Sequence, residues 1–121
     1  MRESILNDKS LDFSLRMVRL FKHLKEVKSE YIMSKQIFRA GTSIGANIHE
    51  AYFGQSKADF IAKLSIALKE CGETQYWLKL LQRGEFITNQ EFDSIMTDCE
   101  ELGKLLTSSI KTAKQNLAEG K

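Results

Sequence analysis

The sequence predicts an all-α protein, an up-down-up-down antiparallel four-helix bundle. Apolar residues recur every three or four positions through four long segments, the period of an amphipathic helix. The 121 residues include no proline, the residue that would interrupt long helices. Connections of about three to six residues place consecutive helices side by side and antiparallel. At this length the chain forms one domain, residues 1–121.

The first helix is expected over residues 10–28 and the second over residues 31–52, before Gly54. The core line of the first helix consists of Phe13, Met17, Leu20, Leu24 and Val27. Its apolar face is widened by Leu11, Leu15, Val18 and Phe21. Both helices therefore present a broad apolar face to the core.

The third helix is expected over residues 57–82 and the fourth over residues 89–117. The hydroxyl of Ser56 can cap the third helix while Asp59 reaches back. Thr88 and Glu91 have the T-x-x-E spacing of a capping box. The core line of the fourth helix runs as far as Leu117.

A polar stripe runs along the second predicted helix, within R-A-G-T-S-I-G-A-N-I-H-E-A at residues 39–51. It consists of Arg39, Ser43, Asn47 and Glu50, at steps of four, four and three. Counting outward from the turn at Gly54 places Arg39 opposite Glu70, so we predict that Arg39 pairs with Glu70 or Glu73. The stripe either fixes the register of two helices or faces a ligand, a nucleic acid or another subunit.

No arrangement of residues indicates catalysis, and we expect no enzyme activity, no metal and no cofactor. Nucleophilic catalysis needs a base beside Ser or Cys, and His49 faces away from the polar stripe. A Gly-rich phosphate loop and metal-ligand spacings are absent from the sequence. Cys71 and Cys99 are predicted to be reduced core residues. They lie nearly level, so a disulfide is geometrically conceivable, but a reducing cytoplasm argues against it.

Positive charge is concentrated in the first part of the chain. Residues 1–40 carry nine Lys and Arg against five Asp and Glu, and the remainder carries nine against eleven. A basic first helix favours non-specific RNA or DNA binding through Arg16, Arg19, Lys22, Lys25 and Lys28. The same asymmetry also suits a head-to-tail contact between copies.

The alternative to nucleic-acid binding is a protein–protein adaptor with no nucleic-acid role. Apolar side chains beside the core line of the third helix suggest an interface at Ile66, Trp77 and Leu80. No apolar run is long enough for a membrane span, and the N-terminus lacks a signal-peptide pattern. We therefore expect a cytoplasmic protein without a membrane partner.

The motif at residues 39–51 resembles the pattern R-[AS]-x-x-S-I-x-x-N-I-A-E-G of the proteins encoded in intervening sequences of bacterial 23S rRNA genes. The resemblance continues to Glu70, and the matched motif positions are Arg39, Ser43, Asn47, Glu50 and Glu70. It departs at His49 and Ala51, where the family has alanine and glycine.

This resemblance implies a four-helix bundle that forms a homopentamer, a non-enzymatic role and a molecular function that is largely unknown. Similar bundles accompany diversity-generating retroelements, where a basic pentameric barrel binds nucleic acid and the reverse transcriptase. The label "ribosomal protein" sometimes given to the family is not evidence that this chain sits in ribosomes.

Overall fold

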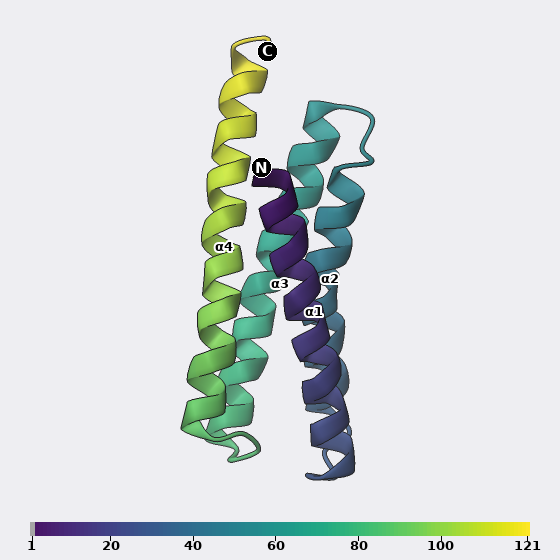
Figure 1. Ribbon diagram of the computed structural model, residues 1–121, viewed down its shortest axis with the longest axis vertical. Coiled ribbons are helices and arrows are strands. Elements are labelled where there is room, and N and C mark those ends of the chain that lie inside the picture. Colours follow the sequence, from purple (N-terminus) through teal and green to yellow (C-terminus); the bar gives the residue numbers. More distant parts are fainter. Residues whose placement is uncertain (1) are drawn as a thin grey trace.

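The computed structural model describes residues 2–121, with side chains from Ile5 onward; Met1, the first residue of the predicted domain, lies outside them. Four helices make up the fold: α1 (Arg2–Glu26), α2 (Met33–Ala51), α3 (Lys57–Arg83) and α4 (Asn89–Ala118). The described chain contains no strand, which confirms the all-α prediction. Figure 1 shows the four helices side by side, with the connecting turns at alternating ends.

Helix α1 begins at Arg2, so the predicted start at Ser10 is wrong. The reason is tertiary packing, because Leu6 is 1% exposed and extends the core by one more turn. At the other end Glu26 is the last helical residue, and Val27 is exposed rather than part of the core line. The chain then turns through Ser29, which has a positive φ of 52°.

Helix α2 begins at Met33, two residues later than predicted, and its N-terminus is held by a buried carboxylate. The side chain of Glu30 accepts hydrogen bonds from the backbone N–H groups of Ile32, Met33 and Ser34, at 3.2, 3.1 and 2.7 Å. These N–H groups have no partner within a helix. Glu30 therefore replaces the side-chain cap that Ile32, the N-cap residue, cannot provide.

The predicted caps of α3 and α4 are both present. The hydroxyl of Ser56 accepts from the N–H of Asp59 at 3.0 Å. Thr88 and Glu91 form a complete capping box, with bonds of 3.1 and 2.8 Å. The N–H of Thr88 donates to the Glu91 carboxylate and lowers the pKa of Glu91 below its ordinary value.

Consecutive helices pack closely, whereas α1 and α4 contact each other sparsely. Across the described residues, α1 does not contact α3 and α2 does not contact α4. The closest approach is between α1 and α2, where Gly41 lies against Met17 and Gly45 against Ser14. The bundle is therefore a sequence of three tight seams closed by one loose seam.

The core is continuous along the bundle, and its large side chains with almost no exposure are Phe13, Leu6, Met17, Leu24, Ile37, Ile44, Ile48, Leu64, Leu78, Leu81, Leu102 and Leu106. Three leucines that the sequence pattern assigned to the core are exposed: Leu11, Leu15 and Leu117. The apolar arc of α1 is wider than its neighbours can cover. In the part of the chain that the structure describes, none of the helices is both long and apolar enough to cross a membrane.

Candidate functional site

The predicted pairing of Arg39 is confirmed. Its guanidinium donates to the carboxylate of Glu70 at 3.1 Å and also to that of Glu73. The Arg39 side chain is 50% exposed, while that of Glu70 is 18% exposed. One cation of α2 thus holds two carboxylates on successive turns of α3.

The other members of the polar stripe are also used within the bundle. The Ser43 hydroxyl donates to the carbonyl of Arg39 at 2.6 Å, and the Asn47 amide donates to the carbonyl of Ser43 at 2.8 Å. Glu50 accepts from Lys63 of α3 at 3.1 Å. The stripe therefore has ion pairs to α3 at both ends and side chain–backbone bonds within α2 between them, an arrangement that fixes register.

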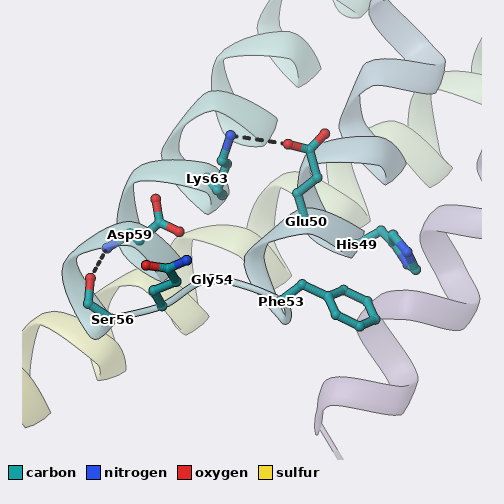
Figure 2. A pocket seen from close by; sticks show the side chains of 8 residues that line it. His49, Glu50, Phe53, Gly54, Ser56, Asp59 and Lys63 are labelled. Atoms are coloured by element: carbon teal, nitrogen blue, oxygen red, sulfur yellow. Dashed lines mark hydrogen bonds and ion pairs between the residues drawn. The ribbon is translucent and has the colours of Figure 1, made fainter.

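A pocket opens beside this stripe at the α2–α3 turn. Its lining residues are His49, Glu50, Phe53, Gly54, Gln55, Ser56, Asp59 and Lys63. Figure 2 shows Glu50 directed toward Lys63, whereas His49 points to the other side, next to Phe53. The two rings of His49 and Phe53 lie 4.9 Å apart.

The polar groups of this pocket already have partners, because Glu50 pairs with Lys63 and the N–H of Asp59 bonds to Ser56. Residues 5–121 contain no group of three His, Cys, Asp or Glu side chains placed to hold a metal ion. The pocket thus offers no evident donor set for a cofactor.

The structure separates the predicted nucleic-acid-binding cations into two groups. Arg16 is turned toward α4, where it bonds to Asp98 at 2.7 Å and to the Ser94 hydroxyl at 3.0 Å. Lys25 lies over the ring of Phe21, 4.9 Å from its centroid. Arg19, Lys22 and Lys28 are exposed.

Part of the predicted charge asymmetry is satisfied inside one chain. Besides the Arg16–Asp98 pair, Lys9 of α1 bonds to Glu101 of α4 at 3.0 Å. The bond to Glu101 raises the pKa of Lys9. Basic α1 and acidic α4 therefore meet along the loose seam of the same bundle.

Two bands of exposed apolar side chains lie on different sides of the molecule. The α3 band is Ile66, Tyr76 and Leu80, which are 44%, 58% and 38% exposed. The α1 band is Leu11 and Leu15, 63% and 45% exposed, with the half-buried Val18. The sequence indicated Ile66 and Leu80, but the α1 band was missed because its residues have ordinary core spacing.

Trp77 lies beside the α3 band but is half-buried rather than exposed, and packs against the core. Its ring meets that of Tyr76 edge to face, with centroids 5.0 Å apart. Its indole N–H is buried and has no hydrogen-bond partner among the described residues. Tyr76 and Leu80 therefore present more of this surface to solvent than Trp77 does.

Cys71 and Cys99 are buried free thiols on facing helices. The Cys99 sulfur donates to the carbonyl of Cys71 at 3.6 Å, as their predicted equal level requires. A hydrogen bond with Cys99 and burial raise the pKa of Cys71 well above its ordinary value. These thiols belong to the core.

Fold and site together define a small helical bundle protein whose polar seam joins two neighbouring helices. The chain belongs to the 23S rRNA-intervening sequence protein family, which it matches over residues 2–108. This confirms the family indicated by the motif at Arg39.

The fold also matches a solved structure, a protein with unknown function from the S23 ribosomal protein family of Bacteroides thetaiotaomicron VPI-5482. The two chains share 56% identity, with a TM-score of 0.91, over 92% of this chain and 99% of the other. No curated protein matches the sequence. The comparisons thus give a family and a fold without a stated activity.

Proposed function

We propose that this protein is a non-enzymatic, cytoplasmic subunit of a homo-oligomer. The observation that carries the proposal is the presence of two exposed apolar bands on helices that do not contact each other. Apolar side chains grouped on a helix face, rather than scattered singly, mark a protein interface. Two such faces allow each copy to bind two others. Five copies is the number that the family resemblance implies.

Sedimentation velocity combined with light scattering tests this proposal at micromolar protein concentration. The expected result is one species with a mass of several 13.8 kDa chains. A monomer throughout the concentration range overturns the proposal. A monomer that instead captures a different protein, and loses it on Trp77→Ala, supports the adaptor function.

A second candidate function is non-specific RNA or DNA binding at the C-terminal end of α1. The observation that favours it is that Arg19, Lys22 and Lys28 form no ion pair within residues 5–121, whereas Arg16 does. Unpaired cations remain available to phosphates, and repetition in an oligomer multiplies a weak contact.

Anisotropy of a short fluorescein-labelled RNA measures this binding at several salt concentrations. The expected affinity falls as salt rises and falls further in a Lys25→Glu/Lys28→Glu variant. Lys111→Glu/Lys114→Glu, with the same charge change near the C-terminus, is the matched control. Absence of binding at low salt, or an affinity that salt does not change, removes this candidate.

A further inference from the structure

The two apolar bands carry a further inference that rests on the proposed self-assembly. Each band lies among exposed charged residues. On α1 these are Asp8, Asp12, Arg19, Lys22 and Glu26. On α3 they are Lys69, Glu73, Lys79 and Arg83, of which Glu73 is partly covered by Arg39. The relative heights of these charges decide whether the two faces fit each other.

Contacts with α2 fix these heights, because α2 touches both helices. Gly45 lies against Ser14 of α1. Gly45 also lies between Arg39, which meets Glu70 and Glu73, and Glu50, which meets Lys63. Interpolation between those ion pairs places Gly45 level with about Ala67 of α3. Ser14 and Ala67 are therefore at similar heights in one molecule.

Helices α1 and α3 run in the same direction, so residue levels can be counted from this anchor (Figure 1). Arg19 lies level with Gly72, next to Glu73. Glu26 lies level with Lys79. Asp12 lies about one turn from Lys69. The order of charge down the α1 face is acidic, basic, acidic, and the order at matching heights on α3 is basic, acidic, basic.

The same heights bring apolar residues together. Leu11 and Leu15 lie at levels on either side of Ile66, and the α3 band continues below through Tyr76 and Leu80. Two faces that match in both apolar and charged positions without an axial shift are complementary. A different charge order, or a match only after sliding one helix, would leave like charges opposed.

We propose that the α1 band of one copy docks on the α3 band of a second copy of this chain, with the two bundles parallel and level. This is a head-to-tail joint, because it uses two different surfaces of the same molecule. At its charged positions Asp12 faces Lys69, Arg19 faces Glu73 and Glu26 faces Lys79.

Both bands lean toward α2, which gives the joint a sense of rotation. Leu11 lines the groove between α1 and α2 together with Ala46 and His49. Ile66 precedes Glu70 by one turn, on the side from which Glu70 reaches Arg39. Successive copies therefore turn in one direction at a constant height and close into a ring, with α2 toward its centre.

A pair of one-sided variants tests the joint in the full chain. One variant carries Leu11→Asp and Leu15→Asp on α1, and the other carries Ile66→Asp and Tyr76→Asp on α3. Each alone is expected to have the mass of a single chain, and an equimolar mixture is expected to form a dimer of one copy of each. The mixture cannot grow further, because each copy keeps one intact face.

The control variants Phe53→Asp and Leu117→Asp change exposed apolar residues outside the bands and are expected to keep the wild-type mass. Circular dichroism verifies that every variant stays helical. The joint is wrong if either one-sided variant alone keeps the wild-type mass, or if their mixture stays monomeric. A wild-type protein that is itself monomeric overturns the proposed function rather than the joint alone.

A charge exchange tests the orientation and does not depend on adding charge to an apolar band. Glu26→Lys and Lys79→Glu are each expected to weaken assembly, and the double variant is expected to restore it. Antiparallel docking places these residues far apart, so a double variant no better than the single ones overturns the parallel arrangement.

Discussion

Gly45 of α2 lies so close to Ser14 of α1 that a Cβ added to the glycine would come within 2.9 Å of the serine hydroxyl oxygen. The same Cβ would lie 3.4 Å from the backbone carbonyl oxygen of Ser10. The absence of a side chain at Gly45 thus sets the distance between the two helices and, through α2, the height of α1 relative to α3.

Gly45→Ala is expected to destabilise the protein by about 1 kcal/mol, because overpacking outweighs the gain in helix propensity. Gly103→Ala is the matched control, since nothing lies within 4 Å of its added Cβ. That control is expected to stabilise by up to about 1 kcal/mol. Urea denaturation measures both, and equal effects of the two substitutions would contradict the close approach.

Glu30→Ala is expected to lower the free energy of unfolding by about 1–3 kcal/mol, since it leaves three N–H groups of α2 without their acceptor. Glu30→Gln keeps one acceptor oxygen and should lose less. Thermal unfolding ranks the variants. The control is Glu100→Ala, an exposed acidic residue of α4. A loss no greater than that of the control would show that Glu30 does not cap the helix.

Arg39→Ala is expected to cost about 1 kcal/mol at low salt, because Glu70 and Glu73 then repel each other without a shared cation. Salt screens both the lost attraction and the new repulsion, so the difference from wild type should narrow as ionic strength rises. Urea denaturation at two salt concentrations measures it. Lys104→Ala, which removes an exposed cation outside this network, should show neither effect.

Glu91→Gln is expected to be less stable than wild type at neutral pH and nearly equal to it in acid. The folded pKa of Glu91 is lowered, so its carboxylate stabilises the fold above the ordinary glutamate pKa. That contribution is lost as pH falls through the lowered value. Melting temperatures of the two proteins across acidic pH measure the narrowing, and a constant gap would argue against the charged cap.

Cys71 and Cys99 are expected to resist an aromatic disulfide reagent in the native protein. Burial and the raised pKa of Cys71 leave little thiolate within reach of the reagent. The labelling rate should therefore follow global unfolding and rise steeply with denaturant. Rapid labelling in native buffer would place the thiols nearer the surface than the packing shows.

Short-range signals account for what the sequence predicted well. The Thr88–Glu91 box and the Ser56 cap depend on residues three apart, and the pairing of Arg39 with Glu70 follows from counting across one tight turn. The start of α1 depends on Leu6 reaching the core, and the role of Glu30 depends on burial of a carboxylate. Neither has a local signature.

The candidate interfaces show the same division. Ile66 and Leu80 lie off the core line of α3, so periodicity indicated their exposure. Leu11 and Leu15 have the spacing of core residues, and only the arrangement of the neighbouring helices leaves them uncovered. Arg16 likewise has the appearance of a free cation until α4 brings Asp98 beside it.

The loose seam between α1 and α4 has a consequence for how the chain folds. All three tight seams join helices that are consecutive in sequence, so each forms by closing a short loop. Only the α1–α4 seam joins distant parts of the chain, and it contributes least to packing. Folding can therefore proceed by successive helical hairpins, without an early search for long-range contacts, and the ends of the chain come together last.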